Sequence, residues 1–534
     1  MTTANGVIAH PDGRVELTPA ARAQVEHSSL SNEDLAPVPL ERRTWTTYSY
    51  MALWIGMSVN IPSWLLAVGL IGIGMDWLQA LITIALGNLI VLVPMLLNSH
   101  AGTKYGIPFP VFARASFGTI GANVAALLRA GVACGWFGIQ TWIGGGAIFV
   151  LVGTILGQGS FWTDAGVIFG QPWTLWLSFA VFWLLNVYII LKGMETLRIF
   201  ESWSAPLLIG FALLLTIWMV VLAAGEPEGI GGIFAQESQL GWGADFWLLF
   251  FPSLMGMIAF WSTLSLNMPD FTRFGRGQRD QALGQALGLP TTMTLFSFLA
   301  VITASASIAV YGEAIWDPVL LVSRLGEGAG FVGAIVVIVA LFAVSLATLT
   351  TNVAANLVSP SYDFSNAWPK MISFRTGGLI TAVVGILIQP WNLLANQNVY
   401  IFTWLGFYGG ALGTIAGVLI ADYWIYRKTA LSLPDLYDSD GAYSYAGGFN
   451  WRALVAFVVG ALLAVGGAYS APGNGPFPEG GLIGFLKFEL PWGGFLYDYS
   501  WVVGLVVAFL LYWVLATVFP QTRAEAAPAA EPVV

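Results

Sequence analysis

Two side chains in the stretch "VACGWFGIQTWIG", residues 132–144, combine a flat aromatic surface with a primary amide. Trp136 and Gln140 are four residues apart, so a helix would place them on one face, one turn from each other. An indole offers a broad ring with a single N–H, and an amide offers a donor beside an acceptor. The pair therefore suits a planar ring that is edged with N–H and C=O groups and held by stacking and hydrogen bonds.

Four further side chains offer the same chemistry on distant segments. Trp261, in "FPSLMGMIAFWS", could supply a second aromatic face. Asn352 and Asn356 lie one helical turn apart in "SLATLTTNVAANLVSP", and Asn60 lies in "GMSVNIPSWLL". Any one of these amides could instead hydrogen-bond a neighbouring helix, and Trp142 is expected to pack or to face lipid. Side chains that suit a flat ring occur on several segments, which favours a shared binding site.

A pair of adjacent hydroxyls suggests a cation site. The hydroxyls of Thr350 and Thr351, with backbone carbonyls freed by a broken helix, could form a small cage of oxygen atoms. A cage without a carboxylate suits a monovalent cation better than calcium; the alternative is that both hydroxyls bond back to their own helix. Glu195, Glu201 and Asp270 are expected near the ends of apolar segments, which leaves no obvious proton carrier and favours sodium.

The elements that position these side chains are membrane helices. Of the 534 residues, 57% are hydrophobic and 9% are charged, and the mean hydropathy is +0.75. This composition predicts an all-α polytopic membrane protein. Runs of about 20 apolar residues predict twelve spans: 47–71, 77–98, 120–156, 172–192, 198–223, 245–267, 283–311, 329–358, 375–390, 398–424, 451–470 and 499–519.

The distribution of basic residues supports the twelve spans. Lys and Arg near span ends favour the cytoplasmic side, and 17 of the 20 basic residues fall there if the N-terminus is inside. Arg324 and Lys487 fall outside, and Arg129 lies within the third span. We therefore expect twelve crossings with both termini in the cytoplasm.

Two spans contain helix breakers at matching positions. Asn60 and Pro62 interrupt the first span, and Pro252 and Gly256 precede Trp261 in the sixth. Each could be a simple proline kink, but irregular backbone at membrane depth is tolerated where it is buried in protein or lines a cavity. Breaks that lie five spans apart predict two inverted five-helix repeats with a binding site between them.

Other function classes find little support. A net charge of −9 argues against nucleic-acid binding, and one cysteine, Cys134, excludes an internal disulfide. His10, His27 and His100 are scattered, and no phosphate loop, zinc motif or nucleophile elbow is present, so an enzyme is not expected. The glycine-rich run "GFYGGALGTIAG", 406–417, is interpreted as a helix-packing surface.

Five stretches together resemble the nucleobase:cation symporter-1 family over residues 45 to 430 or so. They are "HAGTKYGIPFPVFARASFG", "ACGWFGIQTWIGG", "LNMPDFTRF", "NVAANLVSPSYD" and "GTIAGVLIADYWIYRK". The resemblance implies a LeuT-like fold of ten core helices in two inverted repeats, followed by two more helices, that works by alternating access. Members of the family carry nucleobases, hydantoins, allantoin and related compounds.

The resemblance also implies roles for individual residues. It places the substrate between Trp136 and Trp261, with its polar edge towards Gln140, Asn356 and Asn60. It places sodium at the carbonyls of Gly56, Val59 and Ala347 and the hydroxyls of Thr350 and Thr351, and it makes Leu405 part of an outer gate. Asn60 stands where hydantoin carriers have Gln, which resembles the allantoin-carrier pattern. Some members of the family run on protons, so the proton stays open as the ion.

The expected organisation follows. Residues 1–46 form a mobile cytoplasmic tail and residues 47–424 form the transport core, with repeats at about 47–223 and 245–424. A cytoplasmic loop, 425–450, leads to two additional transmembrane helices, 451–519, and a disordered cytoplasmic tail, 520–534.

The expected function is a symporter of the cytoplasmic membrane that imports a planar ureide such as allantoin, uracil or a hydantoin. The coupling ion is expected to be sodium or, as second choice, a proton. No other cofactor, nucleic acid or obligatory protein partner is expected. Open alternatives are another small heterocycle such as cytosine, a purine or a vitamin, an amino acid as cargo, a channel, and a membrane-bound enzyme.

Overall fold

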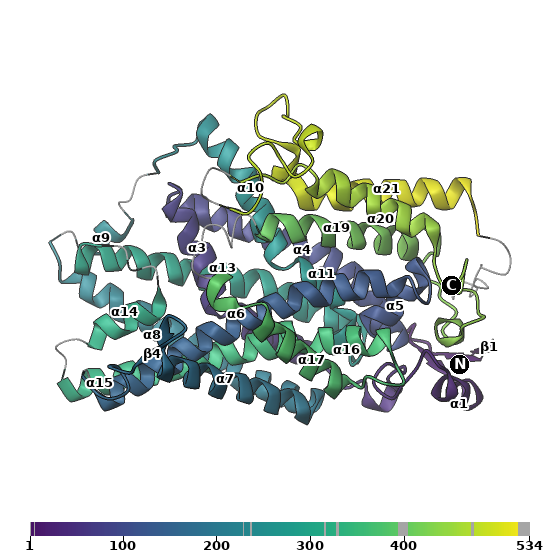
Figure 1. Cartoon of the computed structure of the whole chain (residues 1–534), viewed down its shortest axis with the longest axis horizontal. Coiled ribbons are helices and arrows are strands. Elements are labelled where there is room, and N and C mark those ends of the chain that lie inside the picture. Colours follow the sequence, from purple (N-terminus) through teal and green to yellow (C-terminus); the bar gives the residue numbers. More distant parts are fainter. Residues whose placement is uncertain are drawn as a thin grey trace.

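Long helices that run side by side make up most of the protein in the computed structural model (Figure 1). The structure describes residues 2–4, 6–157, 159–227, 229–234, 238–313, 315, 317–326, 330–393, 404–470 and 475–521. The end of the predicted C-terminal tail and the start of the predicted tenth span, 398–403, lie outside these residues.

Each predicted span overlaps a helix or a chain of helices. In order these are α2 (Thr47–Ser58) with α3 (Ile61–Gly72), α4 (Trp77–Tyr105), α6 (Ala122–Leu156), α7 (Trp173–Lys192), α8 (Met194–Ala224), α10 (Ala244–Phe260) with α11 (Ser262–Asn267), α13 (Gln278–Tyr311), α15 (Gly330–Thr351) with the π-helix η2 (Asn352–Val358) and α16 (Ser359–Ala367), α17 (Phe374–Leu387), α19 (Leu405–Ile420) with the π-helix η4 (Ala421–Tyr426), α20 (Trp451–Val465) and α21 (Ser500–Val518).

Short elements connect the long helices. They are strands β1 (Thr2–Ala4), β2 (Val7–Ala9), β3 (Val15–Leu17), β4 (Val167–Ile168) and β5 (Gln171–Pro172), helices α1 (Pro19–His27), α5 (Phe109–Phe117), α9 (Gly229–Phe234), α12 (Pro269–Thr272), α14 (Pro318–Gly326) and α18 (Pro390–Leu393), and 3-10 turns η1 (Leu40–Arg42), η5 (Pro434–Tyr437), η6 (Gly484–Leu486) and η7 (Leu496–Tyr499).

The membrane character of the chain is confirmed, although the full count of crossings is not. Among the described residues, eight helices are long and apolar enough to span a bilayer, and the bent pair α2 and α3 would be a ninth. The apolar helices α10, α17 and α20 have only 17, 14 and 15 residues. Their crossing of the membrane, and with it the total of twelve, stays a prediction.

The break in the first span is confirmed. The axes of α2 and α3 differ by 60°. Asn60 caps α3, because its side-chain oxygen accepts a hydrogen bond from the Ser63 N–H at 3.0 Å. Pro62 lies in the first turn of α3, where a helix needs no backbone donor. The proline therefore starts a new half-helix instead of kinking a continuous one.

The break in the sixth span is displaced from its predicted position. Pro252 and Gly256 both lie inside α10, which continues to Phe260. The interruption falls at Trp261, whose φ of −100° and ψ of 5° leave the helical region. A proline inside a membrane helix is tolerated because neighbouring groups satisfy the carbonyl that loses its donor, so Pro252 alone was a poor marker of the break.

The eighth span continues beyond its predicted end at residue 358. It widens into the π-helix η2 and then runs on as α16 to Ala367. In a π-helix each N–H bonds the carbonyl five residues earlier, and Pro360 has no N–H. At this transition the Arg129 Nη2 of α6 donates a hydrogen bond to the Ala355 carbonyl at 3.2 Å.

The N-terminal segment is folded, so the prediction of a mobile tail is wrong for its described residues. Strands β1, β2 and β3 form an antiparallel sheet, and Leu17, Val25 and Leu35 are buried in the main core. The Asn32 amide donates to the Ser365 hydroxyl at 2.8 Å and to the Pro369 carbonyl at 2.9 Å. The apolar residues of this polar segment are enough to dock it on the bundle.

Both ends of the described chain lie at one end of the bundle (Figure 1). The Ser28 hydroxyl donates to the Tyr437 carbonyl in η5, and the Arg427 Nη2, just after η4, donates to the Gln521 side chain at 3.3 Å. An even number of crossings, such as the predicted twelve, would give this arrangement. The side of the membrane on which it lies stays a prediction.

The glycine run of α19 is a packing surface, as predicted. A Cβ on Gly410 would lie 2.8 Å from a methyl group of Val465, and one on Gly413 would lie 2.6 Å from the Trp501 carbonyl. Helices α20 and α21 therefore pack tightly on α19, at the upper edge of the bundle in Figure 1.

Candidate functional site

The C-terminal end of α15 lies against the break in the first span. The Thr351 hydroxyl donates to the carbonyls of Gly56 at 2.9 Å and Ala347 at 3.1 Å. The Thr350 hydroxyl bonds the same two carbonyls, at 3.2 and 2.8 Å. Four of the five predicted cation ligands thus meet in one place. We call these four residues the oxygen cage.

The alternative interpretation of the threonines is also correct in part. Both hydroxyls bond back to Ala347 in their own helix, as helical threonines do, yet both also reach across to Gly56. The fifth predicted ligand, Val59, is the residue that ends α2 and is buried. Two hydroxyls and two carbonyls provide neutral oxygen donors, a set that fits a sodium ion.

Trp136 and Trp261 lie in one buried aromatic cluster. The Phe260 ring meets the Trp136 ring edge to face at 5.3 Å between centroids and the Trp261 ring at 4.8 Å. Trp261 also meets Trp54 of α2 edge to face at 5.3 Å. The Trp136 indole N–H donates to the Tyr408 hydroxyl of α19 at 3.0 Å. The two indoles are buried within the bundle, and Phe260 touches both.

Two polar atoms beside this cluster lack partners. Gln140 is buried, one turn beyond Trp136, and its Oε1 has no hydrogen-bond partner in the described part of the chain. The same holds there for the indole N–H of Trp261. Leaving a buried polar atom unpaired costs about 1–3 kcal/mol. An acceptor and a donor left open in one region are what a ligand with both kinds of group could satisfy.

A chain of amides joins η2 to α6. The Asn356 amide donates to the Asn352 side-chain oxygen at 3.0 Å. Asn352 in turn donates to the Thr141 hydroxyl at 3.0 Å and to the Phe137 carbonyl at 3.3 Å. Thr141 directly follows Gln140 in α6. These hydrogen bonds therefore bring the amide side chains predicted to bind substrate, on the third and eighth spans, to neighbouring positions.

Asn60 has a structural task at the break. Its side-chain oxygen caps α3, and its amide donates to the Met57 carbonyl at 2.5 Å. Both ends of the amide are therefore engaged by the backbone. That Asn60 also reads a substrate stays a prediction.

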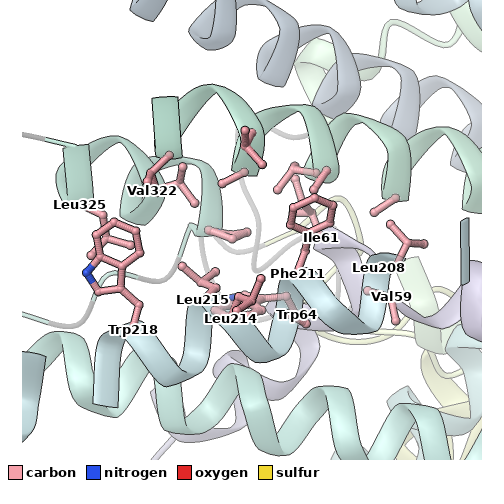
Figure 2. A pocket seen from close by; sticks show the side chains of 18 of the residues that line it. Val59, Ile61, Trp64, Leu208, Phe211, Leu214, Leu215, Trp218, Val322 and Leu325 are labelled. Atoms are coloured by element: carbon pink, nitrogen blue, oxygen red, sulfur yellow. The ribbon is translucent and has the colours of Figure 1, made fainter. Parts of the chain in front are cut away.

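A cavity of about 520 Å³ opens beside the oxygen cage. Figure 2 shows its lining of apolar side chains, including Phe211, Trp218 and Val322. It reaches the break at Val59 and Asn60 and the cage at Ala347, while the predicted aromatic pair is absent from its lining. The cavity thus borders the predicted ion site and not the aromatic cluster.

A carboxylate lies beside the cage, which the sequence predicts from neutral oxygen atoms alone. Glu201 is the eighth residue of α8, close to the helix end as predicted, but its carboxylate packs against Gly56. A residue near the end of its own helix can pack against the middle of a neighbouring span. Its distance from the helix end therefore does not predict which residues of the neighbouring span it contacts.

Two further contacts are not predictable from the sequence. Arg129 of α6 and Asp363 of α16 form a fully buried ion pair at 3.2 Å, signalled only by an arginine inside a predicted span. Tyr408, which accepts the hydrogen bond from Trp136, was hidden in a run interpreted as packing. The predicted gate residue Leu405 is the first residue of α19 and is buried; its gating role is untested.

The sequence matches proteins of one transport family over most of its length. The family model described as permease for cytosine/purines, uracil, thiamine and allantoin matches residues 37–519. An allantoin permease of Bacillus subtilis (strain 168) is 39% identical over 502 residues, which cover 93% of this chain and 95% of the relative. The purine-uracil permease NCS1 of Arabidopsis thaliana is 38% identical over 509 residues, covering 95% and 81%.

The fold matches a solved structure of the same class. Mhp1, a nucleobase-cation-symport-1 family transporter in a closed conformation with bromovinylhydantoin bound, superposes with a TM-score of 0.74 at 26% identity, covering 93% of this chain and 98% of Mhp1. These relatives are permeases and not enzymes. The chain therefore belongs to the nucleobase-cation-symport-1 family of membrane permeases, with the LeuT-like helical fold of Mhp1.

Proposed function

We propose that this protein is a symporter of the cytoplasmic membrane that imports a planar, amide-edged molecule of the allantoin, uracil or hydantoin class with sodium as the coupling ion. Membership of the family establishes a permease for nucleobase-like compounds. The proposal adds the cargo class, the ion, the direction and alternating access as the mechanism.

The observation that carries the proposal is that aromatic rings and amide groups from α6, η2 and the break between α10 and α11 lie near one another. Trp136 and Gln140 provide a ring face and an open acceptor, and Trp261 provides an open donor. Asn352 and Asn356 continue the row of amides towards α15. A flat ring that alternates N–H and C=O groups would satisfy these atoms, and a ring without them would leave them unpaired, which is a basis for selectivity.

The oxygen cage supports the choice of ion. It joins α15 to the broken first span, two elements that alternating access would move relative to each other. A cation held by both elements stabilises the arrangement in which they meet. Coupling requires such a difference in affinity between conformations. A proton is the second candidate, because Glu201 lies beside the cage.

The relatives rank the possible cargoes. The Bacillus subtilis relative is named for allantoin and the Arabidopsis thaliana relative for purines and uracil. The family resemblance also likens Asn60, at the break, to the allantoin carriers. We therefore place allantoin first and uracil second.

The decisive test is uptake of labelled allantoin, uracil and hydantoin into proteoliposomes with an inward sodium gradient, and with choline in its place. We expect accumulation of intact allantoin above its outside concentration, with competition by compounds that share its edge. Equilibration without accumulation would indicate a channel. Accumulation that depends on a proton gradient and not on sodium would identify the proton as the coupling ion. If none of these compounds is taken up, the proposed cargo class is refuted.

A further inference from the structure

We propose that the apolar cavity beside the oxygen cage is a lipid site, which takes up one acyl chain of a membrane phospholipid through the side of the bundle. This assignment goes beyond the proposed function, because it concerns neither the cargo nor the coupling ion. It gives an occupant to the cavity of about 520 Å³ that Figure 2 shows.

The chemistry of the lining favours an apolar occupant. None of the described lining residues is charged, and only Asn60, Trp64 and Trp218 have polar side-chain atoms. The Asn60 amide is already engaged by the backbone of Ser63 and Met57, and each indole offers one N–H and no acceptor. A buried water needs about two to four polar partners, whereas apolar cavities take apolar ligands. A ring edged with N–H and C=O groups would leave most of these groups unpaired in the cavity.

Two helices with lipid-facing side chains form the mouth of the cavity. Leu214 and Ile217 of α8 line the cavity and are 63% and 56% exposed. Ile335 and Val339 of α15 also line it and are 45% and 44% exposed. Both helices belong to segments long and apolar enough to span a membrane, so the medium that meets these four side chains is the hydrocarbon of lipid tails. The cavity is thus continuous with the lipid-facing surface of the protein.

The surface around the mouth is apolar as well. Leu207 and Val221 of α8 and Phe342 of α15 are exposed. Helix α8 has no charged residue after Glu201, and the described part of α15 has none. A polar peptide or a lipid headgroup would find no ionic partner on this part of the surface. An acyl chain needs none, and the bilayer supplies such chains at the mouth.

The far walls of the cavity are closed to lipids that merely surround the protein. Val322 of α14, Leu208 of α8 and Trp64 of α3 line the cavity and are buried (Figure 2). The Trp64 ring meets the Phe296 ring of α13 edge to face at 5.9 Å between centroids, which closes the cavity behind them. A chain that touches these side chains has therefore left the bilayer and entered the bundle.

The position of the cavity gives an acyl chain a structural role. The lining reaches Val59 at the break in the first span and Ala347 in the oxygen cage. A chain in the cavity therefore contacts α3, α8 and α15 at once. The walls of an unfilled cavity lack partner atoms and lose their packing contacts. Occupation by a chain thus stabilises the arrangement in which these three helices surround it.

The test is photo-crosslinking in vesicles of phosphatidylcholine that contain a small fraction of phosphatidylcholine with a diazirine in the middle of one acyl chain. The full-length protein is reconstituted without cargo and with choline in place of sodium, then irradiated and digested, and mass spectrometry locates the labelled residues. We expect label on the buried walls, at Val322 and Trp64, in addition to label on exposed side chains such as Phe342. Label confined to exposed side chains would show surrounding lipid only and would overturn the proposal.

Variants that fill the cavity assign the label to it. Ala343 of α15 lines the cavity and is buried, so Ala343→Phe places a ring in the space of the chain. It should abolish the label on the buried walls and keep the label on exposed side chains. The control is Leu207→Phe, which adds a ring to the exposed face of α8 outside the described lining and should keep both labels. If Ala343→Phe does not fold, Ala340→Phe fills the cavity from the half-buried neighbouring turn of α15, with the same expected loss.

The remaining outcomes are decisive as well. Wall label that persists in a folded cavity-filling variant would place the bound chain elsewhere and overturn the site. Loss of the wall label in Leu207→Phe would show a general effect of added bulk and overturn it too. None of these results depends on the cargo or on sodium. Failure to transport any heterocycle would refute the proposed cargo and leave the lipid assignment intact.

Discussion

Trp136 commits its indole N–H to the Tyr408 hydroxyl at 3.0 Å. A bound ring would therefore meet the indole through its face, and recognition of the polar edge would fall to other groups such as Gln140, whose Oε1 has no partner within the described residues. In the proposed site we therefore expect aromatic rings to stack on the cargo and amides to select its polar edge.

Replacement of Trp136 tests the stacking role. Stacking on an aromatic ring contributes about 1–3 kcal/mol, so Trp136→Ala should raise the KM for uptake roughly 5- to 150-fold, and Trp136→Phe should lose less because it keeps a ring. The control is Trp142→Phe, in a separate cluster with Trp176 and Phe179, which should change uptake less than about twofold. Equal losses in the two phenylalanine variants would argue against a special role for Trp136.

Thr351→Val tests the oxygen cage. Valine keeps the shape of threonine and removes the hydroxyl that reaches Gly56 at 2.9 Å. Loss of one such ligand should raise the half-saturating sodium concentration about tenfold. Thr348→Val is the matched control, because within the described residues the Thr348 hydroxyl bonds only the Val344 carbonyl of its own helix α15. If sodium activation of uptake is the same in both variants, Thr351 is not a ligand.

The types of the site residues were predictable from the sequence, but their contacts were not. The hydroxyl pair and the amides stand out in apolar segments, because polar side chains inside a membrane are energetically costly and often functional. Phe260 and Tyr408 look like ordinary packing residues until two helices bring them against Trp136. Glu201 became informative only through its contact with Gly56.

At the scale of elements, apolar runs located the helices well. The third and fourth spans, predicted at 120–156 and 172–192, appear as Ala122–Leu156 and Trp173–Lys192. Departures from regular helix were harder to predict. Such departures depend on tertiary contacts, for example the hydrogen bond that Arg129 donates to the Ala355 carbonyl of η2, and one sequence does not reveal these contacts.

The ion pair of Arg129 and Asp363 tests the link between α6 and α16. Removal of one partner from a buried pair leaves an uncompensated charge and destabilises by about 3–5 kcal/mol. Asp363→Asn should therefore lower the melting temperature of the purified protein markedly. Glu195→Gln breaks an exposed pair with Arg198, and exposed pairs contribute about 0–1 kcal/mol, so it should melt nearly as the unmodified protein does. Similar melting of both variants would contradict a stabilising role for the buried pair.

The topology of the whole molecule can be tested with single cysteines. Cys134 is buried, so Cys134→Ser gives a background without a reactive thiol. Cysteines at Phe169 and Phe485, which are 90% and 85% exposed, should react with an impermeant maleimide added to intact cells. A cysteine at Met371, which is 81% exposed, should react only after permeabilisation. The reverse pattern would invert the predicted orientation and place both termini outside.

Composition and the distribution of basic residues predicted a helical membrane bundle, because bilayer thickness and charge placement act on any sequence. The docking of the N-terminal segment was not predictable in the same way. Its contacts, such as Asn32 with Ser365 and Pro369, join residues more than 300 positions apart. Such contacts depend on the tertiary structure and leave little trace in local composition.

The glycine row of α19 restricts how the bundle can change shape. The backbone of α21 lies against it so closely that a Cβ on Gly413 would come within 2.6 Å of the Trp501 carbonyl. Two helices in such close contact cannot slide or tilt independently without opening a gap that no side chain could fill. We therefore expect α19, α20 and α21 to move as one rigid body, with any hinge at the ends of these helices.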